Sequence, residues 1–250
     1  MNLRSLVLSL VLGSTFLIAE EAKDENSLRW KGFNLGMNIG GLINDSKMHI
    51  TPIGGFLEPA FLPNNPYRTH SHTFKNIGLT TGAQLGYNYQ ISYFIIGLET
   101  DFNYSSLKYC HFKKLVEFDD GDQSISFTEK HKINWFGTVR PRIGVGFKSF
   151  DLYVTGGFAY GHIKGRSLIT NNADFYAGSE SKVKTGWTVG GGSDISLNDT
   201  WSLKLEYLFL DFKKISFTNP TDIAGYESYK FGTKVKTKMH CIRLGINKMF

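Results

Sequence analysis

The feature that most constrains this chain is a two-residue alternation of bulky apolar side chains with small or polar ones, which recurs in eight segments. In the first segment, Phe33, Leu35 and Met37 alternate with glycine and asparagine. A period of two places successive side chains on opposite faces of an extended strand. An all-β chain of two-faced strands is therefore expected. The segments cover residues 32–40, 77–89, 94–104, 132–147, 152–161, 183–195, 201–209 and 241–250.

The connections between these segments alternate between short and long. Brief turns are expected near residues 90–92, 148–151 and 198–200, whereas the stretches 44–75, 106–130, 165–182 and 213–235 are long and polar. This rhythm is typical of an antiparallel up-and-down barrel with tight turns at one end and four long loops at the other. An even strand number then places both termini at the tight-turn end. Strands of about 10–12 residues, tilted by ~45°, would span ~25 Å of apolar thickness.

Alternation alone does not say whether the apolar face lines a core or meets lipid. A soluble lipocalin-like barrel would be apolar inside, whereas a membrane barrel is apolar outside. An eight-stranded barrel has a lumen only just wide enough to be filled by side chains, and the residues of the apolar face are too many and too large for it. We therefore expect an eight-stranded transmembrane β-barrel. Four bulky residues break the pattern by falling on the other face: Phe136, Tyr153, Leu208 and Leu210.

The face opposite the apolar one is rich in glycine and carries charges of both signs. Glycine leaves room in a narrow lumen for a few large polar groups, and buried charges are tolerated there when they are paired and hydrogen-bonded. We expect a lumen plugged by charge pairs, which argues against a general diffusion pore; an ion or proton path is the alternative. The expected members are Glu99, Asp101, Arg140, Arg142, Asp194, Lys204, Glu206 and Arg243.

The N-terminal region, residues 1–19, has the pattern of a cleaved secretory signal peptide. Arg4 precedes an apolar stretch from Leu6 to Ile18, and Ala19 is a small residue at which cleavage could fall. Residues 20–29 are then expected to be a short periplasmic segment, and residues 30–250 the barrel domain. No later apolar run approaches the ~20 residues that a spanning helix needs. If the chain spans a membrane, it does so with strands.

The formal net charge of +6 is spread along the chain rather than clustered. Nucleic-acid binding normally shows a concentrated basic face, so no nucleic-acid partner is expected, and contact with anionic lipid phosphates fits better. The two cysteines, Cys110 and Cys241, are expected in a loop and inside the barrel, on strands that are not neighbours. One disulfide and two free thiols remain open alternatives.

Five stretches carry a family pattern: WKGFNLGMNIG (30–40), TVRPRIGVGF (138–147), LYVTGGFAYGHIK (152–164), GWTVGGGSDISLNDTWSLKLEYLFLDF (186–212) and HCIRLGINKMF (240–250). They resemble the small outer-membrane β-barrel proteins of alphaproteobacterial type, a porin-like family with haemin-binding and Opa-like surface members. Pro141 and Asp194 depart from the family pattern. The resemblance implies a cell-surface protein of the outer membrane with a structural or interaction role. Its expected partners are outer-membrane lipid and lipopolysaccharide, the barrel-assembly machinery reading the terminal Phe250, and haemin or host surface molecules.

The first long stretch carries a candidate haem site. Histidine and tyrosine can ligate haem iron, and the resemblance to haemin-binding proteins draws attention to these residues. Ordinary solvated loop side chains are the favoured alternative, so no cofactor is assigned. The candidate ligands are His49, Tyr67, His70 and His72, with Phe56, Phe61 and Phe74 as an apolar cradle.

A lipid-modifying enzyme is the second alternative, because outward His162 and His240 lie near the expected long loops. Such an enzyme needs a serine within hydrogen-bond reach of the histidine, and no spacing in the sequence supplies one. No catalytic residue is assigned, and a non-enzyme is expected. The acidic run 118–122 lacks the spacing of an EF-hand loop, so no metal site is expected either.

Overall fold

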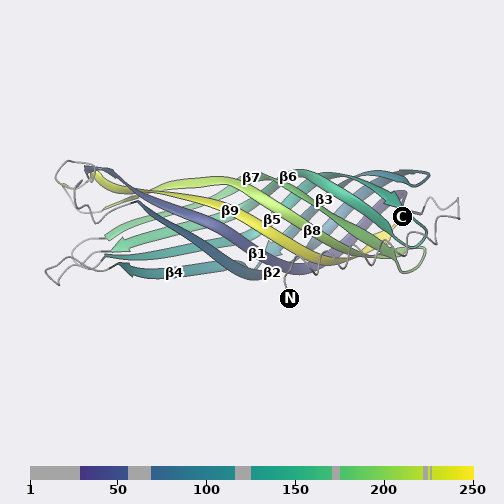
Figure 1. Ribbon diagram of the computed structural model, residues 1–250, viewed down its shortest axis with the longest axis horizontal. Helices are drawn as coiled ribbons and strands as arrows, with labels where there is room; N and C mark the ends of the chain where they lie inside the picture. Colours follow the sequence, from purple (N-terminus) through teal and green to yellow (C-terminus); the bar gives the residue numbers. More distant parts are fainter. Residues whose placement is uncertain (1–28, 56–68, 116–124, 171–174, 222–224, 226) are drawn as a thin grey trace.

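The computed structural model describes residues 29–55, 69–115, 125–170, 175–221, 225 and 227–250 (Figure 1). No helix in these residues is long and apolar enough to span a membrane. The described chain is built almost entirely of strands. They are β1 (Gly32–Gly54), β2 (His70–Ile91), β3 (Phe94–Ser105), β4 (Lys108–Leu115), β5 (Ile125–Gly146), β6 (Asp151–Thr170), β7 (Phe175–Ser196), β8 (Trp201–Pro220) and β9 (Tyr229–Met249).

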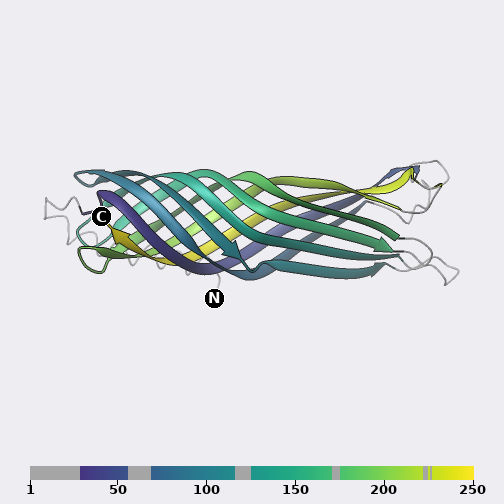
Figure 2. The same ribbon diagram turned by 180° about the vertical axis from the view of Figure 1, so that it is seen from behind.

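The strands close into a ring of antiparallel neighbours. Their hydrogen-bonded order is β3-β2-β1-β9-β8-β7-β6-β5-β4, and β3 also pairs with β5. Because β3 and β4 pair with successive parts of β5, they act as one interrupted strand. The wall therefore has eight strand positions. The opposite views in Figures 1 and 2 show the strands wound around one axis. The predicted eight-stranded up-and-down barrel is confirmed.

Both ends of the described chain lie at the tight-turn end of the barrel. The backbone N–H of Phe250 donates to Phe33, and the Arg29 guanidinium pairs with Asp199 in the turn between β7 and β8. Trp30 is buried at this end, with its indole N–H donating to the carbonyl of Phe147 at 2.7 Å. Tight turns of outer-membrane barrels face the periplasm, so this end is called the periplasmic end below.

The strands are about twice as long as the alternation predicted. β1 has 23 residues, β5 has 22 and β8 has 20. The prediction of four long loops was wrong over most of 44–75, 106–130, 165–182 and 213–235, because strands continue into each of them. The two-residue alternation persists there, but the apolar residues now face inward and the polar residues face outward. Met48 and Ile50 face inward, whereas Lys47 and His49 face outward. The outward apolar residues on which the predicted strand ends were based stop where this exchange begins.

The periplasmic half of the barrel is apolar outside. Its exposed residues include Leu35, Leu79, Ile96, Val154 and Leu244. Aromatic residues cluster near both margins of this band. Toward the periplasmic end they are Tyr87, Tyr89, Trp201 and Phe250, and toward the other margin they are Tyr104, Trp135 and Phe209. The predicted lipid-facing surface and its aromatic girdles are both present.

The four bulky exceptions to the alternation point inward. Phe136, Leu208 and Leu210 are fully buried, and Tyr153 is nearly so. One further assignment was wrong: Ile133 is buried inside, whereas Lys132 and Asn134, which we had placed on the inner face, lie outside. A register shift between Ile133 and Trp135 causes the change. A β-bulge adds one residue to a strand and so reverses its facing.

The outer half of the barrel opens into two sheets. β7 pairs with β8 only from Gly186 to Ser196, and no pairing joins β2 to β4 in the described residues. The sheet β4-β5-β6-β7 therefore faces the sheet β2-β1-β9-β8. The two are drawn apart toward the end opposite the C-terminus in Figure 1, where an isolated bridge between Tyr176 and Thr221 still joins them. An apolar core fills the space between them. Its aromatic and methionine members are Met48, Phe74, Phe127, Phe136, Tyr176, Phe212, Phe217, Phe231 and Met239.

This sandwich is held at its open edge by stacked rings. His72 on β2 stacks on His111 of β4 with ring centroids 4.2 Å apart, and Phe74 stacks on Tyr109 at the same distance. Neighbouring His131 is buried in the core, and burial lowers the pKa of its imidazole to about 4. A histidine in that environment is neutral at physiological pH.

Candidate functional site: the charged lumen and the outer wall

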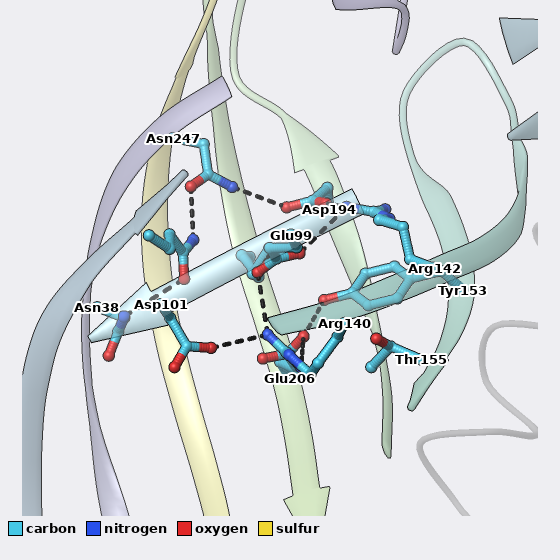
Figure 3. A network of polar contacts seen from close by, with 12 residues as sticks. Asn38, Glu99, Asp101, Arg140, Arg142, Tyr153, Thr155, Asp194, Glu206 and Asn247 are labelled. Carbon is cyan, nitrogen blue, oxygen red and sulfur yellow. Dashed lines mark hydrogen bonds and ion pairs between the residues drawn. The ribbon is translucent and has the colours of Figure 1, made fainter. Parts of the chain in front are cut away.

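The lumen of the periplasmic half contains one connected network of charged side chains (Figure 3). All eight predicted members are buried there. They come from β3, β5, β7, β8 and β9, so the network ties together strands on all sides of the barrel. Alternation predicts this convergence, because every member lies on the inward face of its strand.

Arg140 is the centre of the network. Its guanidinium lies 2.9 Å from Asp101, 3.0 Å from Glu206 and 3.2 Å from Glu99. Arg243 completes the same cluster, with its Nη2 2.8 Å from Asp101 and 2.5 Å from Glu206. Lys204 lies 2.7 Å from Glu99. The three cations thus neutralise three carboxylates in a space without exposed side chains.

Arg142 organises the part of the network nearest the periplasm. It pairs with Asp194 at 3.0 Å and with Asp151 at 2.6 Å. Its guanidinium also lies over the Tyr153 ring, 3.7 Å from the centroid, and the Tyr153 hydroxyl donates to Glu206 at 2.8 Å. This tyrosine therefore joins the two halves of the network.

Asp151 and Tyr153 are the members that sequence analysis missed. Asp151 was assigned to a turn, and Tyr153 was treated as an exception. Asp151 and Tyr153 alternate with outward residues in the same way as Thr155, so all three face inward on β6. This two-residue spacing from Thr155 was the signal in the sequence that could have identified them. An amide chain, also missed, extends the network: Asn247 donates to Asp194 at 3.1 Å and accepts from Gln84 at 2.6 Å.

Inward glycines make the space that these side chains occupy. A Cβ placed on Gly192 would lie 2.7 Å from the Tyr153 hydroxyl, and one on Gly97 would lie 3.0 Å from Cγ of Arg142. Such contacts are too close for a packed interior. The glycine-rich inner face is therefore part of how the large charged groups fit, as the sequence predicted.

The candidate haem ligands do not all come together. His49 faces outward on β1, where Nδ1 lies 2.7 Å from the Ser71 hydroxyl. His72 faces inward and hydrogen-bonds the Tyr109 hydroxyl at 3.0 Å, so these two histidines lie on opposite faces of the wall. Tyr67 and the side chain of His70 lie outside the described residues, as do Phe56 and Phe61 of the expected cradle. Haem binding stays a prediction.

The outward histidines of the enzyme hypothesis have different surroundings. His240 lies 2.7 Å from the Tyr207 hydroxyl. His162 on β6 has its Nε2 3.1 Å from the hydroxyl of Ser181 on β7, and its Nδ1 2.7 Å from the amide of Asn134 on β5. The structure thus places a serine and an amide on the two nitrogens of one imidazole. The sequence could not show this, because the bulge in β5 decides that Asn134 faces outward.

The comparisons identify the kind of barrel. The chain matches the profile of the outer membrane protein beta-barrel domain over residues 9–237. The chain belongs to this outer-membrane β-barrel family. The barrel with an apolar outer band and a charged lumen is therefore located in the outer membrane, as predicted.

Relatives of this outer-membrane barrel come from alphaproteobacteria. It is 33% identical over 175 residues to the 31 kDa outer-membrane immunogenic protein of Brucella melitensis, covering 69% of this chain and 67% of that one. It is 31% identical over 155 residues to the 22 kDa outer membrane protein of Rhizobium leguminosarum, covering 60% and 63%. Among solved structures, OprG from Pseudomonas aeruginosa aligns with 11% identity and a TM-score of 0.47, covering 88% of this chain and 99% of OprG.

Three remaining sequence expectations concern the two cysteines, the acidic run and the N-terminal segment. Cys110 was expected in a loop, but it is exposed on the outward face of β4, whereas Cys241 is buried inside on β9. Both are free thiols, because the wall of the barrel separates them. The acidic run 118–122 and the proposed signal segment 1–19 lie outside the described residues.

Proposed function

We propose that this protein is a sealed structural and surface-interaction barrel of the outer membrane. The observation that carries the proposal is the double closure of its interior. A network of buried ion pairs occupies the periplasmic half, and an apolar core occupies the outer half. Solute passage would require both a broken ion-pair network and a disrupted core. The two-sheet outer half offers a rigid surface that supports contact with molecules outside the cell.

Conductance and deletion phenotypes test this proposal together. Purified protein reconstituted in lipid vesicles should add no measurable permeability to ions or small sugars above protein-free vesicles. A deletion strain should become more sensitive to detergents and chelators, and the full-length gene should restore resistance. Stable open channels from the unaltered protein would contradict the sealed lumen, and an unchanged deletion strain would contradict the envelope role.

A lipid ester hydrolase is a second candidate function, favoured by the Ser181–His162–Asn134 arrangement. All three lie outside the wall, beside lipid-facing Trp135 and Val183. The oxygen and nitrogen of an asparagine amide exchange places on a flip, and an Oδ1 facing Nδ1 would leave Nε2 free to accept the serine proton. Ser181 Oγ could then attack an acyl ester carbonyl, with His162 passing that proton to the leaving alcohol. Water would hydrolyse the acyl-serine and return the free enzyme.

Fatty-acid release from diacyl phospholipid in mixed micelles tests the second candidate. The unaltered protein should release fatty acid, detected by mass spectrometry, and Ser181→Ala should reduce release to the protein-free level. Ser179→Ala is the matched control, because Ser179 lies two residues away on the same face of β7. No release from the unaltered protein, or equal release from Ser181→Ala, would exclude this function.

A further inference from the structure

A groove of about 520 Å³ crosses the outer sheet β4-β5-β6-β7. The other side of this sheet is packed against the apolar core through Ile133 and Ile163, both fully buried, so the groove opens outward. Five of its twelve lining residues are cations, and they come from three adjacent strands. They are Lys108, Lys130, Lys132, Lys164 and Arg166.

The pairing register places these cations directly opposite one another. Lys132 on β5 lies opposite Lys108 on β4 and also opposite Lys164 on β6. Two residues further out, Lys130 lies opposite Arg166. Directly opposed residues on one face have Cβ atoms only ~4.5–5.5 Å apart, and like charges in such pairs destabilise a sheet. Two successive rows of like charge therefore repel across the same strands.

Counter-charges on the described residues do not relieve this repulsion. Among the described residues, none of the five cations forms an ion pair. Glu180, which also lines the groove, is paired with Lys182 at 2.7 Å. By contrast, Lys236 and Lys238 on β9 lie 3.6 and 3.9 Å from Asp211. The groove thus gathers five cations that have no ion-pair partner in the described part of the chain, and an external anion would relieve their repulsion.

The position of the groove indicates which anion it meets. Val183 on β7 belongs to the apolar band and is 55% exposed, and Ser181 lies two residues before it. On the neighbouring strand β6, Lys164 lies two residues after His162. With a rise of ~3.3 Å per residue and a strand tilt of ~45°, two residues advance about 5 Å along the barrel axis. The first basic row therefore lies about 5 Å beyond the outer margin of the apolar band. That is the level of lipid headgroups.

We propose that this groove binds the phosphate groups of a phosphorylated glycolipid in the outer leaflet, the lipid portion of lipopolysaccharide. Lysine binds phosphate as a point charge, and basic residues beside an anionic membrane surface are attracted to it. Two opposed rows match a headgroup that carries more than one phosphate. Binding would also fix the rotation and depth of the barrel in the membrane. This site goes beyond the sealed-barrel function and does not depend on it.

Binding of diphosphorylated lipid A in mixed micelles to the full-length protein tests the proposal. The Lys132→Ala/Lys164→Ala variant should bind at least tenfold more weakly than the unaltered protein, and added salt should reduce the difference. The matched control is Lys213→Ala/Lys214→Ala, which removes two exposed lysines of β8 outside the groove. The control should bind within about twofold of the unaltered protein.

Parallel titrations separate the ligand sources. Enzymatically dephosphorylated lipid A and inorganic phosphate should each bind far more weakly than the intact lipid. Equal loss in both double variants, undiminished binding of the dephosphorylated lipid, or preference for a soluble polyanion such as heparin would overturn the proposal. In detergent without lipid, the groove variant should be at least as stable as the unaltered protein, because it removes opposed like charges. A less stable variant would show that contacts within the chain explain these lysines.

Discussion

Replacing Arg140 with alanine is expected to reduce the free energy of unfolding by about 3–5 kcal/mol, because removing one partner leaves uncompensated buried charges. The side chain is fully buried and contacts Glu99, Asp101 and Glu206 within 3.2 Å. All three carboxylates are themselves buried in the lumen. Reversible urea unfolding in lipid vesicles, followed by tryptophan fluorescence, measures the loss. The unboiled band of a heat-modifiability gel should convert to the unfolded band at a lower temperature.

Arg29→Ala is the matched control for this substitution. Arg29 pairs with Asp199 at 3.2 Å, and the Asp199 side chain is fully exposed. Arg29 itself is 18% exposed. An ion pair with one fully exposed partner is screened by water and contributes about 0–1 kcal/mol, so Arg29→Ala should cost far less stability than Arg140→Ala. If Arg140→Ala cost less than about 1 kcal/mol, the network would not hold the strands together, and hydration of the lumen would have to be reconsidered.

Phe136→Ala should destabilise the outer half of the barrel by about 3–5 kcal/mol. Phe136 is fully buried where β5 enters the apolar core between the two sheets. Truncating a buried phenylalanine removes its transfer free energy and leaves a cavity that the closed wall can only partly fill. Urea unfolding in vesicles measures the change, and limited proteolysis from outside should cut the outer half faster.

Phe112→Ala makes the same chemical change on β4, where the ring is 64% exposed. A surface change of this kind is usually within about ±0.5 kcal/mol. Similar unfolding curves for the two variants would show that the outer half lacks the packed core described above. Loss of the barrel band with Arg140→Ala alone would instead locate the stability in the lumen network.

The sequence reliably indicated which face of each membrane-spanning strand meets lipid. With a strict two-residue alternation, the apolar face can point only into the barrel or out of it. The lumen of an eight-stranded barrel is too small for the apolar side chains, so they must point outward. The charged members of the lumen followed from the same argument, since each lies in phase with inward glycines. Asp151 and Tyr153 were missed because one was assigned to a turn and the other is bulky, although both share the parity of Thr155.

The outer half could not be predicted in the same way. Its strands have an apolar inward face and a polar outward face, which is the pattern of a soluble sheet. The predicted strands therefore ended near Ile39 and Phe209, where the outward apolar residues stop. In the structure, β1 and β8 continue beyond these residues. The bulge between Ile133 and Trp135 also reverses which side chains of β5 face inward. A regular two-residue alternation cannot predict such a reversal.

The amino-acid sequence by itself determined the all-β class, the strand number, the lipid-facing surface and the charged residues of the lumen, because these depend only on alternation along each strand. Tertiary structure decided which residues of different strands become neighbours. The opposed rows of Lys132 and Lys164, and the contact of Ser181 with His162, arise from register. Register depends on where each strand ends and where bulges interrupt it, and the ends of the strands are what the sequence pattern left open.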